Sequence, residues 1–163
     1  MKGGVIAVLV IIVILFGGVF TAKKILTTHN PQPTPTLAPL QELTEDQYPT
    51  VSLKFSSDGH YVTVDIINIH SDQLEYNLIY DAVVKGNKIQ TGVNASAKQE
   101  GSTTYSKQQL LGSESSGKFT YHTNIKNAVM ELTLRDAGNR SVYSATYPFE
   151  VIPGSTADLK PSE

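Results

Sequence analysis

The stretch Val51 to Ile67, VSLKFSSDGHYVTVDII, contains two runs in which apolar and polar residues alternate. Alternation with a period of two is typical of a strand that buries one face, because successive side chains point to opposite sides of a sheet. The turn-forming residues Ser57 to Gly59 lie between the two runs. The stretch therefore predicts a β-hairpin whose buried face carries Val51, Leu53, Phe55, Val62, Val64 and Ile66.

The apolar phase changes at the end of the second run, since Ile67 and Ile69 fall on the other parity. A β-bulge, or a bend that takes the chain to another sheet, would account for the change. We expect a loop over residues 70–73, followed by a third strand. Its buried face carries Leu74, Tyr76, Leu78 and Tyr80.

The remaining strands are predicted by the same alternation. They comprise a returning strand through Ile89, Thr91 and Val93, short strands over 105–111 and 118–122, a strand with Ala128, Met130, Leu132 and Leu134 on one face, and a last strand over 141–152 with Tyr143, Ala145, Tyr147, Phe149 and Val151 on one face. Pro148 cannot donate to a ladder, so we expect this last strand at an edge or beside a bulge. Turns are predicted at 85–88, 112–117 and 136–139.

Residues 94–103, NASAKQEGST, show no apolar period. We interpret them as the longest loop and as the best candidate for a variable binding edge. With this loop, residues 48–152 hold about seven or eight short strands and no convincing helix, a pattern that predicts an all-β antiparallel sandwich. A barrel such as an oligonucleotide-binding fold is the alternative.

Two segments of this domain carry a family resemblance. The hairpin Glu131 to Phe149, ELTLRDAGNRSVYSATYPF, looks like a closing Asp-x-Gly-Asn hairpin, and Leu78 to Asp81 reads LIYD. In both segments the chain resembles the immunoglobulin-like and fibronectin-III-like domains of membrane-anchored bacterial surface proteins, although their closing hairpin commonly has one more loop residue. The resemblance implies an immunoglobulin-like sandwich that serves as an adhesive, spacer or binding module, and it does not imply any catalytic residue.

An uncharged apolar stretch, Gly3 to Ala22, precedes this domain. As a helix it would be about 30 Å long, which matches the hydrocarbon thickness of a bilayer. We expect residues 1–24 to be an uncleaved membrane anchor, since a cut after Ala22 would leave the large Phe20 three residues before the cleavage site. A cleaved signal peptide is the alternative.

Residues 25–47 are expected to form a stalk, because Pro31, Pro33, Pro35 and Pro39 favour an extended polyproline conformation. The lysines on the two sides of the anchor are balanced, so the stalk decides the predicted orientation, with the C-terminal domain outside the cytoplasm. An ordinary cytoplasmic linker is the alternative. Residues 153–163 are expected to be a disordered polar tail.

The charge balance of 13 basic and 15 acidic residues shows no basic cluster and argues against a nucleic-acid partner. The chain contains no cysteine, which excludes disulfides and thiolate metal sites. We therefore expect the partners to be membrane lipid, through the N-terminal helix, and a protein or cell-envelope polymer.

Chemical sites are not predicted by any motif, and we expect no catalytic, metal-binding or cofactor-binding residue. His70, Ser71 and Asp72 are chain neighbours and cannot converge as a hydrolase triad. His60 and His122 lack partners at a metal-ligand spacing. The possible calcium ligands are better explained as turn residues; they are Asp58, Asp72, Asp136 and Asn139. A sugar-binding surface would draw on the tyrosines expected outside the core, which are Tyr61, Tyr105 and Tyr121.

The sequence thus favours a membrane-tethered extracytoplasmic β-sandwich that acts as a binding, adhesion or spacer module at the cell envelope. Three alternatives stay open. The domain is an accessory subunit of an envelope or secretion complex that offers an edge strand to a partner, an envelope enzyme with a site around His60, His70 or His122, or a carbohydrate-binding module.

Overall fold

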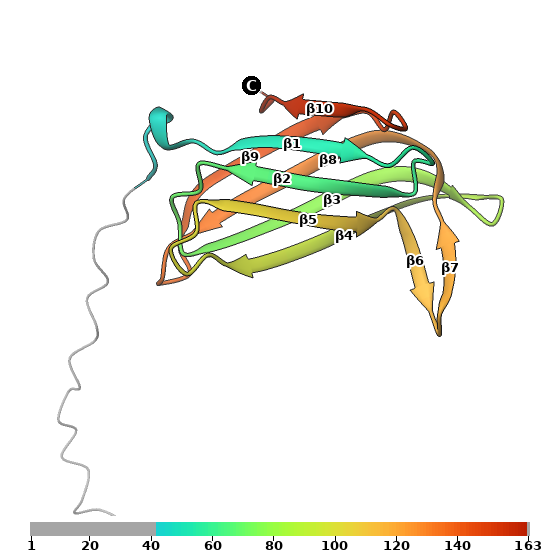
Figure 1. Ribbon diagram of the computed structural model, residues 1–163, viewed down its shortest axis with the longest axis horizontal. Coiled ribbons are helices and arrows are strands. Elements are labelled where there is room, and N and C mark those ends of the chain that lie inside the picture. The colour runs from blue at the N-terminus through green and yellow to red at the C-terminus, as the bar shows by residue number, and fades with distance from the viewer. Residues whose placement is uncertain (1–41, 163) are drawn as a thin grey trace, which may run out of the picture. The chain divides into compact units, whose positions relative to one another are not determined.

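The structure, a computed structural model, describes residues 42–162. This part of the chain is built almost entirely from antiparallel strands, with one short 3-10 helix at Glu45–Gln47 (Figure 1). The strands are β1 (Thr50–Phe55), β2 (Tyr61–Ile67), β3 (Gln73–Val84), β4 (Asn87–Lys98), β5 (Thr104–Leu110), β6 (Gly112–Ser115), β7 (Lys118–Tyr121), β8 (Thr123–Arg135), β9 (Ser141–Phe149) and β10 (Thr156–Leu159).

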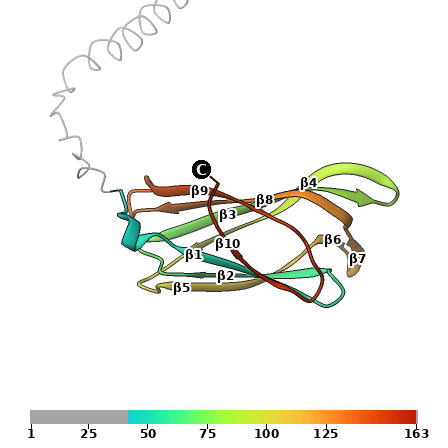
Figure 2. The ribbon, with the colours of Figure 1, turned by 90° about the horizontal axis from the view of Figure 1, so that it is seen from above.

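These strands form two four-stranded sheets and one two-stranded ribbon. The sheet orders are β10-β1-β2-β5 and β4-β3-β8-β9, and β6 pairs with β7. Figure 2 shows the two larger sheets as separate layers, one above the other. The predicted all-β antiparallel, sandwich-like fold is confirmed at this level, and the strands number about ten instead of seven or eight.

The β1–β2 hairpin forms as its alternation predicts. Its six core-facing residues are all buried, and the two strands pair without interruption from Thr50 opposite Ile67 to Phe55 opposite Val62. In the turn, the Ser56 hydroxyl donates to the Asp58 carboxylate at 2.6 Å. Gly59 has a φ of 70°, a conformation that glycine adopts without the steric cost other residues meet.

The change of apolar phase after Ile66 marks a bend between the two sheets. β2 ends at Ile67 and the chain enters the other sheet at β3, with Asn68 in the left-handed conformation (φ 61°). The Asn68 side-chain amide donates to the carbonyls of Asp46 and Tyr48 at 3.1 and 3.0 Å and so holds the bend. Ile67 is 52% exposed, whereas Ile69 is 2% exposed and belongs to the core.

The core lies between the two sheets and uses one face of each central strand. Leu74, Tyr76, Leu78 and Tyr80 of β3 are buried, as predicted, and so are the four apolar residues predicted for the strand that is β8. β3 and β8 pair from Gln73 opposite Arg135 to Val83 opposite Thr123, with irregularities on either side of Asp81. The two strands therefore form the centre of their sheet.

The loop predicted for residues 94–103 is wrong. β4 continues to Lys98 in full register with β3, and only a short turn joins it to β5. The residues of this strand that face the sandwich are small and half-buried, including Ala95 and Ala97. An edge strand buries little, so its sequence does not carry the strong alternation of a central strand.

The disordered tail predicted for residues 153–163 is also wrong, because β10 lies within it. β10 pairs with β1 from Val51 opposite Leu159 to Lys54 opposite Thr156. Backbone hydrogen bonds to the free edge of β1 hold this segment, and these require no apolar pattern. The turn predicted over residues 112–117 is only partly correct, because Gly112–Ser115 form β6 and the turn is confined to Ser116 and Gly117.

The predicted edge position of the Pro148 strand is confirmed, since β9 ends its sheet. Segments from both ends of the described chain lie along this edge. The Leu43 N–H donates to the Val142 carbonyl at 3.2 Å, and the Ser162 N–H donates to the Thr146 carbonyl at 2.7 Å. These two hydrogen bonds and Pro148 limit pairing of another strand at the outer edge of β9.

The expected anchor at 1–24 and most of the expected stalk at 25–47 lie outside the described residues. Within residues 42–162, no helix is long and apolar enough to cross a bilayer.

Ending the chain at Pro153 should lower the free energy of unfolding by about 1–4 kcal/mol, because four cross-strand pairs with β1 are lost and each contributes roughly 0.2–1 kcal/mol. Thermal unfolding followed by circular dichroism measures this effect. Lys160→Ala, which leaves β10 in place, should unfold at the temperature of the unmodified chain. An unchanged unfolding temperature after truncation would mean that β10 does not stabilise the domain.

Candidate functional site

Four aromatic side chains gather where the β6–β7 ribbon leaves the sandwich, at the end opposite residue 42 (Figure 1). The ribbon is fixed at its base, because the Leu111 N–H donates to the His60 carbonyl at 2.8 Å and the His122 N–H donates to the Leu111 carbonyl at 2.9 Å. We call this group the tip cluster and define it as His60, Tyr61, Phe119 and Tyr121.

Three rings of the tip cluster, those of His60, Tyr121 and Phe119, lie parallel to one another. The His60 and Tyr121 rings lie 3.7 Å apart between centroids with 7° between their planes. Phe119 and Tyr121 are also parallel within 7°, at 6.2 Å, and Tyr61 meets Tyr121 edge-on at 6.5 Å. Aromatic pairs at such separations are stabilised by their quadrupoles in addition to their burial.

The β6–β7 register explains why these rings share one face. Phe119 and Tyr121 are two residues apart on β7, and Glu114 and Gly112 stand opposite them on β6. Gly112 is required there, since a Cβ atom would lie 2.6 Å from the Thr120 carbonyl oxygen. Phe119 remains 48% exposed, although apolar rings of this size are usually buried.

Acidic groups border the tip cluster. The Ser56 hydroxyl and the His60 N–H donate to Asp58 and lower the pKa of its carboxyl group, with the nearby imidazole adding to the effect. The His60 Nδ1 atom lies 3.3 Å from the Asp58 carboxylate. The pKa of Tyr61 is raised, first by desolvation and then by Tyr121. The cluster therefore combines aromatic surface with hydrogen-bond acceptors at its rim.

His122 is buried beside the core. Its Nδ1 atom is 2.9 Å from the Tyr80 hydroxyl, and both side chains are buried. Burial raises the pKa of Tyr80 to about 12 and lowers that of His122. The pair can satisfy a buried hydroxyl and a buried ring nitrogen with one hydrogen bond.

His70 contacts neither His60 nor His122 in the interactions described above. Its Nε2 atom is 2.9 Å from the Asn68 side-chain oxygen, and it lines a hollow of about 260 Å³ together with Asp72 and Asp136. The Ser71 hydroxyl donates to the Gln73 carbonyl and so stabilises the loop that precedes β3. Among residues 42–162, no three histidine or carboxylate side chains form a group that could hold a metal ion.

The residues considered as calcium ligands take part in turns. The Arg140 guanidinium contacts Asp136 at 2.6 and 2.8 Å, and the hydrogen bonds from Arg140 hold the pKa of the Asp136 carboxyl below its usual range. Asn139 adopts a left-handed φ of 62°, and its N–H donates to the Asp136 carbonyl at 2.9 Å. These contacts close the β8–β9 hairpin.

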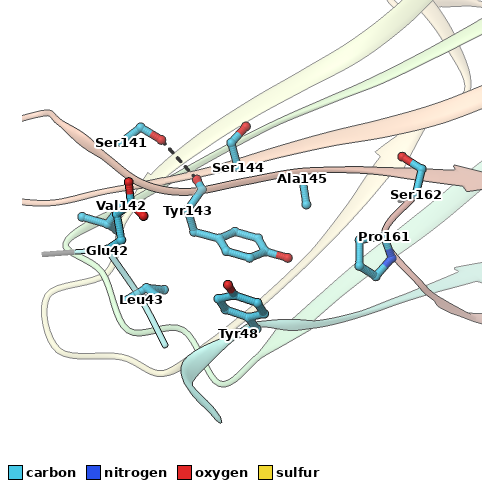
Figure 3. A pocket seen from close by; sticks show the side chains of 10 residues that line it. All are labelled: Glu42, Leu43, Tyr48, Ser141, Val142, Tyr143, Ser144, Ala145, Pro161 and Ser162. Atoms are coloured by element: carbon cyan, nitrogen blue, oxygen red, sulfur yellow. Dashed lines mark hydrogen bonds between the residues drawn. The ribbon is translucent and has the colours of Figure 1, made fainter. Parts of the chain in front are cut away.

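A second hollow, of about 470 Å³, lies beside the edge strand β9 (Figure 3). The Tyr48 and Tyr143 rings lie against each other in its lining, 4.9 Å apart between centroids and tilted by 53°, and Pro161 and Ser162 line another side. The Tyr143 hydroxyl pairs with the Tyr147 hydroxyl at 2.8 Å. This hollow is formed by the chain segments that cover β9.

The tyrosines expected outside the core divide into two groups. Tyr61 and Tyr121 are half-buried in the tip cluster. The expectation is wrong for Tyr105, whose hydroxyl is buried and whose ring packs edge-on against Tyr76 at 6.0 Å. Phe119 was not singled out by the sequence. In KFTYH, two aromatic residues alternate with polar ones, so both rings lie on one face of a short strand. This pattern could have identified Phe119.

No family model matches the sequence, and neither a curated protein nor a solved structure shows significant similarity to it.

The stability of the domain should fall as the pH drops from about 7 to about 5, in part because of His122. Its pKa is lower in the folded state than the ordinary value of 6.5, so the unfolded chain binds the proton more readily. The stability contributed by neutral His122 is therefore present above pH 6.5 and is lost as the pH falls towards the folded-state pKa.

Unfolding midpoints at several pH values measure this dependence. His122→Gln should reduce the slope below pH 6.5, and Gln108→Ala, a change at an exposed residue that does not titrate, should leave it unaltered. Equal slopes in the unmodified chain and in His122→Gln would show that His122 does not contribute.

Proposed function

We propose that the protein is a membrane-tethered, extracytoplasmic binding module of the immunoglobulin-like class that contacts a protein or polymer of the cell envelope through its tip cluster. The observation that carries this proposal is the row of parallel rings formed by His60, Tyr121 and Phe119, in which Phe119 is 48% exposed and the other two are half-buried. Exposed aromatic surface rimmed by polar groups is typical of interaction sites, because the rings bury a large area with little loss of side-chain freedom.

The strand order supports the immunoglobulin-like class. If β1, β2 and β5 correspond to strands A, B and E, then β3, β8 and β9 correspond to C, F and G, which lie on the opposite sheet in that class. β4 takes the place of strand C′ beside C. The β6–β7 ribbon is then an insertion between strands E and F, and insertions of this kind commonly carry function.

The tether is supported by the uncharged stretch Gly3 to Ala22 and by the prolines that follow it. The described residues begin at 42, and the tip cluster lies at the other end of the sandwich (Figure 1). A ligand at the tip would therefore meet the domain far from the point of attachment.

The contacts of the candidate polar residues favour binding over catalysis. His122 pairs with Tyr80, His70 contacts Asn68, and Asp136 is engaged by Arg140. Each of these interactions closes a turn or satisfies a buried atom. His60 is the histidine in the tip cluster, where it stacks on a ring and extends the contact surface.

A photo-crosslinking amino acid at Phe119 tests the use of the tip cluster. In cells of the source organism that express the full chain, we expect a discrete crosslinked adduct from position 119. The matched control is Ile152, which is 55% exposed and lies outside the tip cluster. Adding Tyr121→Ala to the Phe119 variant should reduce the adduct about tenfold or more. Equal adducts from positions 119 and 152 would argue against a binding role for the tip.

Cysteine labelling tests the orientation. Because the chain has no cysteine, a single Ser116→Cys in the exposed β6–β7 turn can be labelled without background. We expect a membrane-impermeant maleimide to label this variant in intact cells as fully as after lysis. Labelling that appears only after lysis would place the domain in the cytoplasm and would contradict the extracytoplasmic assignment.

A further inference from the structure

The two main sheets end in four edge strands, and three of these carry features that discourage pairing with another chain. β9 is covered by Leu43 and Ser162 and contains Pro148. β10 is only four residues long, and β5 has the exposed Lys107 at its centre. Short strands, prolines and central lysines all limit edge-to-edge association.

β4 is the fourth edge and differs from the other three. It is twelve residues long, pairs with β3 along its whole length, and has no strand of the described chain on its outer side. Its sequence is uncharged from Ile89 to Ala97, with Lys88 and Lys98 at the two ends. A long uncharged edge of this kind can accept another strand.

The side chains of β4 leave room for a neighbouring strand on both faces. Towards the sandwich, Val93, Ala95 and Ala97 are only half-buried, and the two alanines contact the core. The solvent face carries Gly92, Asn94 and Ser96, which are small and uncharged. An added strand would therefore complete the burial of the alanine row without a steric conflict on the outer face.

We propose that β4 pairs antiparallel with β4 of a second copy of this chain, about a two-fold axis that passes close to Gly92 or Asn94. On the face towards the sandwich, the first half of β4 carries the larger Ile89 and Thr91, and the second half carries the small Ala95 and Ala97. A two-fold axis near the centre of the strand reverses the second copy and so places its larger half against the smaller half of the first.

The register of this pairing is restricted by faces and charges. In a continuous antiparallel sheet, directly opposed residues have their side chains on the same face, and side chains alternate between the two faces along each strand. The two-fold axis must therefore pass between one residue and the same residue of the second copy. An axis at Val93 would oppose Lys88 to the second copy's Lys98, which like charges disfavour. An axis at Gly92 opposes Lys88 to Ser96, and an axis at Asn94 opposes Lys98 to Gln90.

The pairing is expected to be weak in dilute solution. One pair of strands buries less than the roughly 800 Å² per partner that is usual for stable complexes. Two copies in one membrane would meet at a higher effective concentration, so the pairing is best measured in the membranes of cells that express the full chain.

Disulfide crosslinking in the cysteine-free chain tests the proposal. Asn94→Cys alone should form a disulfide-linked dimer if the axis lies at Asn94. Two differently tagged chains, one with Asn94→Cys and one with Gln90→Cys, should crosslink to each other if the axis lies at Gly92. Opposed Cβ atoms are then about 4.5–5.5 Å apart, close enough for a disulfide after a small adjustment. The control is Gln108→Cys, an exposed position on β5.

We expect at least fivefold more dimer from one of the two β4 tests than from the β5 control. Adding Ser96→Lys, which places another charge in the centre of β4, should remove this excess, whereas Ser106→Lys on β5 should not. Thermal unfolding of both lysine variants should match that of the unmodified chain, since both positions are exposed. Dimer yields equal to the control, an excess that survives Ser96→Lys, or an adduct with a different protein would each overturn the proposal.

Discussion

The domain depends on the packing of one row of side chains from each strand between two four-stranded sheets. β2 and β3 illustrate this constraint, because they are consecutive in the chain but belong to opposite layers. The chain can pass between them only if its inward face changes at the bend. Asn68 makes that change in a left-handed conformation, and its side chain binds two carbonyls of the segment that precedes β1.

Tyrosines at the boundary of this core link the layers through their hydroxyl groups. Tyr76 of β3 accepts a hydrogen bond from Gln109 of β5 at 2.7 Å, which joins one sheet to the other. Tyr80 reaches His122 at the base of the β6–β7 ribbon. A tyrosine can bury its ring and still satisfy its hydroxyl in this way. The buried tyrosines and His122 are thus part of the structure, whereas Phe119 of the tip cluster is exposed.

The edge strands of the two sheets differ in how far other segments of the chain cover them. The segments around Leu43 and Ser162 cover β9, and β10 covers the edge of β1 that would otherwise be open. β4 receives no such cover from the described residues. Because unpaired backbone groups at an edge attract further strands, the difference between β9 and β4 has consequences for how the domain meets other molecules.

The alternation of apolar and polar residues determined β1, β2, β3, β8 and β9, because β1, β2 and β3 bury one face and β8 and β9 bury part of one, and burial selects the side chains at every second position. The same sequence determined the turns at Gly59 and at Asp136 to Asn139. It predicted β4 only as far as Val93 and did not predict β10. These strands are held at sheet edges mainly by backbone hydrogen bonds, which every residue except proline can form, so their side chains carry little record of the structure.

The tip cluster was decided by the tertiary structure alone. His60 belongs to the β1–β2 turn and Tyr121 to a ribbon far along the chain, and their stacking follows from the hydrogen bonds that fix the ribbon beside that turn. A local pattern can report which face of a strand is buried. It cannot report which two distant segments meet, because that depends on the order of strands within the sheets.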